Sequence, residues 1–142
     1  MTSLNIPMPL QQLVRRRAGN RCEYCQTPES LSGIACEVDH IIPRAHGGPT
    51  TAENLCLACV SCNGHKQAKT HATDPKTGAE TPLFHPRQQH WRDHFAWNEN
   101  GATIVGVTAC GRATVDALML NNPLIMVARS MWVSIGQHPP KD

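Results

Sequence analysis

Aromatic residues are scarce in this sequence: two Phe, three Trp and one Tyr make up 4% of its 142 residues. Because so few large side chains give a small core little apolar surface to bury, we expect a non-hydrophobic staple in the N-terminal half, such as a structural metal. Long hydrophobic runs are missing too, and no stretch approaches transmembrane length. There is no internal repeat and no low-complexity tract. These absences indicate one soluble domain with room for a small appended module, and no membrane partner.

A secretory signal is also absent from the sequence pattern. The first residues have no cationic segment followed by an apolar run, so we expect no signal peptide. Seven cysteines cannot form a complete disulfide framework. We therefore expect a reducing, cytoplasmic location, where paired cysteines indicate metal binding.

Charge of one sign does not dominate, since the formal net charge is only +2. The excess lies in residues 1–71, which hold seven Lys/Arg and five Asp/Glu, whereas residues 72–142 hold six of each. Four zinc-bound thiolates would cancel this excess. Charge alone therefore does not predict nucleic-acid binding, and the basic clusters only hint at it.

The cysteines form two short hooks, Cys22-x-x-Cys25 and Cys59-x-x-Cys62. A tight turn with two intervening residues aims both thiolates at one ion, and tetrahedral zinc takes four such ligands. The 33 residues between the hooks exceed the usual zinc-ribbon spacing, so this interval must hold structure of its own. Four thiolates leave no open position, which makes the zinc structural. Redox-active or core cysteines are the alternative, and a second hook, Cys56-x-x-Cys59, is present; we interpret Cys36, Cys56 and Cys110 as packing residues.

Periodicity and punctuation divide the chain into a core at 10–72, a linker at 73–81 and a C-terminal module at 82–140. We expect a helix over 9–18, strands at 34–40 and 55–58, and a helix from Cys62 to about Thr70. The module should hold a hairpin of 95–97 with 103–105 around Asn100-Gly101, a helix over 111–120 and a helix from Pro123. The last helix has one apolar face, formed by Leu124, Ile125, Ala128, Met131, Trp132 and Ile135.

The residues between the hooks carry a series of polar motifs in fixed order: Glu37-Val-Asp39-His40-Ile-Ile-Pro43, a Gly-rich loop, Asn54-Leu55, and then Cys59-x-x-Cys62-Asn63-x-x-Lys66. This order closely resembles the HNH endonuclease family over residues 15–71. The resemblance implies an α+β fold with a zinc-stapled ββα-metal core. It also implies that Asp39 ligates a catalytic cation, His40 is the general base and Asn54 holds the loop that carries it. Asn63 stands where His is frequent, and its amide oxygen would be the second ligand.

The chemistry agrees with the resemblance. Phosphodiester hydrolysis needs a deprotonated water and stabilised phosphoryl charge, and a neutral imidazole can take the water's proton near neutral pH. A carboxylate with an amide oxygen favours Mg²⁺ or Mn²⁺, and such a cation keeps open positions for phosphate oxygens. The expected activity is metal-dependent hydrolysis of DNA, with no small-molecule cofactor. Cutting both strands would require a homodimer or two encounters.

Several alternatives stay open at this stage. A non-catalytic zinc module that binds DNA or protein, or a nuclease directed at RNA, would share parts of the pattern. Asn63 would also serve as a helix N-cap. The aromatic residues near 91–97 form either a platform for bases or a small satellite core, and Arg112 has no physical account. The residues expected to contact nucleic acid are basic, although each would also fit a solvated surface: Lys66, Arg44, Arg15 and Arg16.

Overall fold

The computed structural model describes residues 6–141, and residues 1–5, where no signal peptide is expected, lie outside it. The described chain falls into two compact units. Unit 1 runs to Thr70 and includes His85–His90, and unit 2 comprises His71–Phe84 and the residues from Trp91 onward. Within residues 6–141 no helix has both the length and the apolar composition needed to cross a bilayer.

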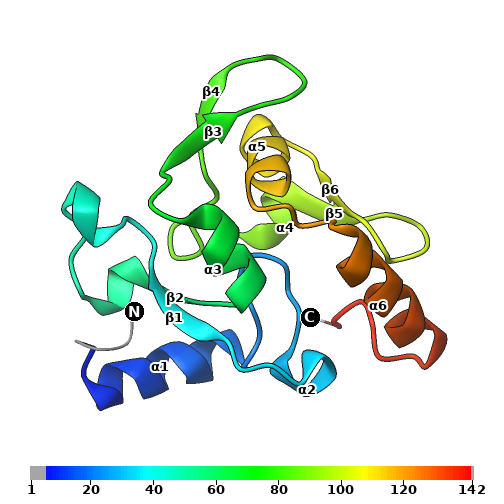
Figure 1. Cartoon of the computed structure of the whole chain (residues 1–142), viewed down its shortest axis with the longest axis horizontal. Coiled ribbons are helices and arrows are strands. Elements are labelled where there is room, and N and C mark those ends of the chain that lie inside the picture. Colours follow the sequence, from blue (N-terminus) through cyan, green and yellow to red (C-terminus); the bar gives the residue numbers. More distant parts are fainter. Residues whose placement is uncertain (1–5, 142) are drawn as a thin grey trace. The chain divides into compact units, whose positions relative to one another are not determined.

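Unit 1 is built on a two-stranded antiparallel hairpin, β1 (Glu37–His40) with β2 (Leu55–Ala58). Helix α1 (Met8–Ala18) packs along this hairpin and α3 (Val60–Lys66) lies next to β1 (Figure 1). A short α2 (Glu29–Ser32) follows the first hook, and the loop between the strands holds two 3-10 turns, η1 (Arg44–His46) and η2 (Ala52–Asn54). The order β1–β2–α3 is the predicted ββα core, so the expected α+β fold class is confirmed.

Strand β1 is shorter than the expected 34–40. The residues before Glu37 do not continue the pairing with β2, because side chains bind the backbone of Cys36. The Cys36 N–H donates to Glu29 Oε2 (2.5 Å), and the Cys36 carbonyl accepts from Arg15 Nη2 (2.6 Å). The same two side chains form an ion pair of 2.7 Å. The segment before β1 is therefore held by a side-chain clamp and not by a sheet.

Helix α3 begins and ends earlier than predicted. Cys59 is its N-cap, and the Cys59 sulfur accepts the Cys62 N–H, so the hook itself starts the helix. Asn63 lies inside the first turns, which excludes the N-cap alternative for that residue. At the other end Gln67 has φ 51° and ψ −132°, a conformation that stops the helix after Lys66.

The segment 73–81, expected as a linker, takes part in a hairpin of β3 (His71–Thr73) with β4 (Glu80–Pro82) in unit 2. Asp74 organises the turn: its carboxylate accepts the Lys76 N–H and the Thr77 hydroxyl. Arg112 binds the same carboxylate through two hydrogen bonds of 2.9 Å. The Arg112 guanidinium holds the pKa of Asp74 well below its usual range. Arg112, unexplained by sequence, thus ties α5 (Ala109–Ala117) to this turn.

The predicted hairpin of unit 2 forms, with the second strand shifted by one residue: β5 (Phe95–Trp97) pairs with β6 (Ile104–Gly106). Asn98 closes the turn through hydrogen bonds with the Thr103 backbone, which removes Thr103 from the strand. Trp91 in α4 (Trp91–His94) stacks on buried Phe95 at 5.1 Å. The aromatic residues therefore pack against each other, as a satellite core requires.

Helix α5 begins at the hydroxyl of Thr108, which accepts the Gly111 N–H. A Cβ at Gly111 would lie 1.9 Å from the His94 carbonyl oxygen. Only glycine permits this close approach of backbone to helix, which explains the glycine beside Arg112.

Helix α6 (Pro123–Ser134) starts at the predicted Asn122 cap, whose Oδ1 accepts the Ile125 N–H. The expected apolar face is not the buried one: Leu124, Met131 and Ile135 are 82%, 65% and 66% exposed. The fully buried residue of α6 is Arg129. Its guanidinium donates to the Ala102 and Leu120 carbonyls and lies over the Trp97 ring. The hydrogen bonds of Arg129 orient helix α6. The spacing of apolar residues cannot predict such bonds.

Candidate active site

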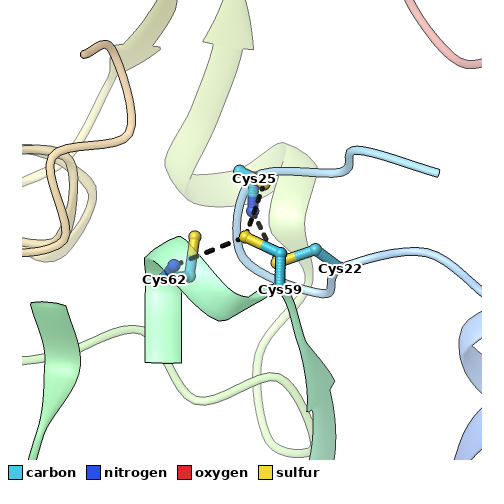
Figure 2. Close-up of side chains that lie close together, drawn as sticks. All are labelled: Cys22, Cys25, Cys59 and Cys62. Atoms are coloured by element: carbon cyan, nitrogen blue, oxygen red, sulfur yellow. Dashed lines mark hydrogen bonds between the residues drawn. The ribbon is translucent and has the colours of Figure 1, made fainter. Parts of the chain in front are cut away.

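Four cysteines of unit 1 form one cluster, in which all sulfur atoms lie within 4.8 Å of one another (Figure 2). Cys22 and Cys25 come from the turn after α1, and Cys59 and Cys62 come from the start of α3. The two hooks have the same local structure: the N–H of the second cysteine donates to the sulfur of the first, at 3.4 Å in one hook and 3.3 Å in the other. Such bonds stabilise thiolate charge.

The geometry of this cluster fits tetrahedral zinc. Four sulfurs at about 2.3 Å from one ion lie about 3.8 Å apart, and Cys25 and Cys59 sulfurs are 3.7 Å apart. Hydrogen bonding with the Cys22 thiol lowers the pKa of Cys25, whereas burial raises the pKa of Cys22. A divalent cation would allow all four thiols, of which three are buried and that of Cys59 is half-buried, to ionise together. The cluster thus suits a structural zinc ion.

The three remaining cysteines lie outside this cluster. The Cys56 sulfur lies 3.7 Å from the hydroxyl of buried Tyr24, so the competing hook Cys56-x-x-Cys59 does not form. Burial raises the pKa of Cys56 to about 12, as it does for Cys36. Both thiols are therefore protonated packing groups near neutral pH.

Asp39 and His40 are the last residues of β1 and are 5% and 4% exposed. His40 pairs with Leu55 in the sheet register, and beyond it the Ile41 N–H still donates to the Asn54 carbonyl. Strand β1 ends at His40. The side chains of adjacent strand residues point to opposite faces of a sheet, so both can serve one site only where the strand ends. His40 Nε2 lies 2.8 Å from the hydroxyl oxygen of Thr50. Burial lowers the pKa of His40.

Asn54 closes the loop that joins the two strands. Its Oδ1 accepts the Ile42 N–H (2.9 Å), and its Nδ2 donates to the carbonyls of Ile42 (3.0 Å) and Pro49 (2.9 Å). The buried amide thus binds both ends of the loop. A Cβ at Gly48 would lie 1.7 Å from the Ile42 carbonyl oxygen and 2.8 Å from Asn54 Nδ2, so glycine is needed for this closure.

Helix α3 presents two polar residues to the face of β1 that carries Glu37 and Asp39. Lys66 Nζ lies 3.0 Å from Asp39 Oδ2 and donates to the His40 carbonyl at 3.1 Å. One turn earlier, Asn63 Nδ2 donates to Glu37 Oε1 at 2.8 Å. Burial raises the pKa of Asp39, and the Lys66 ammonium acts against that shift. Two polar pairs therefore connect helix and strand at the candidate site.

The basic residues expected at nucleic acid differ in their availability. Lys66 is only 2% exposed, so it is neither a surface lysine nor open to a phosphate in this conformation. Arg15 is engaged by Glu29 and the Cys36 carbonyl. Arg16 and Arg44 are exposed.

Sequence reasoning missed the partners that support the site residues. The spacing of Lys66 on the face of Asn63 suggested a common role, but its burial under β1 has no sequence signal. Thr50 is another such partner, since nothing in the sequence distinguishes it from its neighbour Thr51.

Comparison with known proteins agrees with this geometry. Residues 22–69 match the family model described as HNH endonuclease. A stretch aligned over 81 residues, 54% of this chain, is 36% identical to the CRISPR-associated endonuclease Cas9 of Corynebacterium diphtheriae. The match covers 7% of that protein's length. No solved structure matches the chain. Residues 22–69, which hold both hooks and every polar motif between them, are therefore the part of this chain that is similar to the HNH endonuclease family.

Proposed function

We propose that this protein is a metal-dependent endonuclease that hydrolyses phosphodiester bonds of DNA, with His40 as general base. The observation that carries the proposal is the end of β1, where buried His40 and Asp39 follow each other beside a loop closed by Asn54. This arrangement lies within the segment that matches the HNH family.

The surroundings of His40 suit a base. Because burial lowers its pKa, the imidazole is neutral near pH 7 and has a lone pair for the proton of an attacking water. The three hydrogen bonds of Asn54 hold the loop beside the end of the strand, and so limit the movement of the loop residues around the His40 imidazole. Asn54 is therefore assigned a positioning role, with no contact to the reacting atoms.

Asp39 and Asn63 are assigned to the catalytic cation. Asp39 Oδ2 is a buried oxygen without a hydrogen bond in the described structure, although Lys66 Nζ lies 3.0 Å away. A carboxylate oxygen of Glu37 accepts the hydrogen bond from the amide nitrogen of Asn63, so the amide oxygen of Asn63 is left for another partner. These hard oxygen donors suit Mg²⁺ or Mn²⁺. Such an ion, when bound, would stabilise charge on the phosphoryl oxygens.

The substrate assignment rests on the exposed basic residues of unit 1. Arg16 on α1 and Arg44 at η1 are free to contact a phosphate backbone, while Arg15 and Lys66 support the fold. Contacts to phosphates hold a nucleic acid without reading its sequence. DNA cleavage in one strand per encounter is the expected activity, and a homodimer would be one route to cutting both.

The test uses zinc-loaded protein and supercoiled plasmid, with Mg²⁺ or Mn²⁺ added or left out; omission is better than EDTA, which would also remove zinc. We expect cation-dependent nicking, and a loss of at least ~100-fold in His40→Ala, the usual contribution of a general base. His90→Ala, an exposed histidine of the same unit, is the matched control and should nick at the normal rate.

The outcomes separate the alternatives. No cleavage with either cation, while plasmid is still bound, would identify a zinc-stabilised binding module. Cleavage of a single-stranded RNA in preference to plasmid would move the substrate to RNA. Equal nicking by His40→Ala would refute the assigned base.

A further inference from the structure

Thr50 lies in the loop between η1 and β2, and its hydroxyl is the hydrogen-bond partner of His40. The oxygen is 2.8 Å from His40 Nε2, and the ring is 4% exposed. Thr50 is held there from both sides: Asn54 Nδ2 binds the carbonyl of the preceding Pro49, and Asn54 N–H donates to the carbonyl of the following Thr51. The hydroxyl therefore occupies a fixed place beside the ring.

This contact limits which ring nitrogen can act as a base. Nε2 faces the hydroxyl whichever group donates, so a water molecule cannot reach its lone pair. Among residues 6–141 no hydrogen bond is made to Nδ1. If Thr50 donated to Nε2, the neutral ring would carry its proton on Nδ1, and neither nitrogen could accept a proton from water. A base at this position requires the opposite polarity.

We propose that Thr50 is a positioning residue for His40, an inference that rests on the proposed function. The Nε2–H of the neutral imidazole donates to Thr50 Oγ1, which selects one tautomer and leaves the lone pair on Nδ1. Nδ1 is then the atom that takes the proton of the attacking water, and Nε2 keeps its own proton throughout. Partners of the second ring nitrogen commonly fix tautomer and ring orientation in this manner.

The direct test is the tautomer itself, read from the imidazole ¹⁵N resonances of the zinc-loaded protein at a pH where His40 is neutral. The His40 signals are identified by their absence from His40→Gln. We expect Nε2 in the protonated, pyrrole-like range and Nδ1 in the pyridine-like range. Thr50→Val has the same shape without the hydroxyl, and there the two forms should mix. A pyridine-like Nε2 in the wild type would overturn the inference, whether or not the protein cleaves DNA.

Nicking rates supply the second readout. We expect kcat to fall about tenfold in Thr50→Val, a factor within the range for one lost hydrogen bond. Thr50→Ser retains the hydroxyl and should recover most of this rate. Thr51→Val makes the same change one residue on, at an exposed side chain that makes no cap hydrogen bond, and should nick normally. Equal rates in Thr50→Val and the wild type would overturn the role of Thr50 and leave the nuclease proposal standing. Absence of wild-type nicking would refute the proposed function instead.

Discussion

Replacing Lys66 with methionine would remove the ammonium that lies 3.0 Å from Asp39 Oδ2. The two side chains are 2% and 7% exposed, so the carboxylate would be left buried without its partner. Breaking one side of a buried ion pair costs about 3–5 kcal/mol, because the remaining charge loses its compensation while water stays excluded. Methionine fills a similar volume, so a packing defect contributes little. The cost is a large part of the ~5–15 kcal/mol that stabilises a domain.

The assay is thermal unfolding followed by circular dichroism at a fixed free zinc concentration, since zinc binding shifts the midpoint. We expect the midpoint of Lys66→Met to fall by at least ~10 °C. Lys69→Met, at an exposed lysine three residues on, is the control and should stay within ~0.5 kcal/mol of the wild type. A cost below ~1 kcal/mol for Lys66→Met would refute the reasoning that the pair compensates a buried charge.

The same variant tests the assignment of Asp39 as a cation ligand. With the ammonium gone, a divalent cation is the compensation available for the carboxylate. Added Mn²⁺ should therefore raise the midpoint of Lys66→Met more than that of the double variant Asp39→Asn/Lys66→Met. An equal response in the two variants would count against Asp39 as a ligand.

Three further predictions concern other parts of the molecule. Zinc analysis should find one ion per chain. Cys59→Ser should lose this ion and unfold unit 1, whereas Cys36→Ser should retain it, because the Cys36 sulfur lies outside the cluster. Retention of zinc by Cys59→Ser would argue against the site. Asn54→Ala should lower the free energy of unfolding by ~1–3 kcal/mol in a denaturant titration, since buried backbone groups of the loop lose their hydrogen-bond partner. The variant should also nick plasmid more slowly. An unchanged free energy of unfolding would contradict the role of Asn54 in closing the loop. Asp74→Asn should lower the midpoint of thermal unfolding at pH 7, because the depressed pKa of Asp74 means that its charged form stabilises the fold. The difference in midpoint between the wild type and Asp74→Asn should narrow as the pH falls below ~3.9, where the carboxylate becomes protonated. A difference that stays constant with pH would exclude the ion pair with Arg112 as its cause.

Much of unit 1 could be predicted because its signals are local. A Cys-x-x-Cys turn specifies its own geometry, and α1 ends at Gly19 in the left-handed conformation that favours glycine. Strand β2 has the predicted bounds, since its residues are all buried and bounded by turn signals. The polar motifs keep a fixed order along the chain, so the family could be recognised before any geometry was known.

Unit 2 was predicted less well, because its structure depends on contacts between residues far apart in sequence. The segment 73–81 has the composition of a linker, yet Arg112 binds Asp74 across 38 residues and stabilises a hairpin there. Periodicity assigned the face of α6 to apolar side chains, while a single buried arginine with carbonyl partners orients the helix.

The sequence by itself was sufficient to predict the α+β fold with its four-cysteine cluster and the similarity of residues 22–69 to the HNH family, and to propose a candidate base, because spacing and order of residue types carry this information. Only the tertiary structure decided what surrounds that base. Lys66 is a buried counter-charge for Asp39, Glu37 holds the amide of Asn63, and the hydroxyl beside His40 belongs to Thr50 and not to Thr51. These partners are selected by distance and direction in the folded chain, which the residue types alone do not encode.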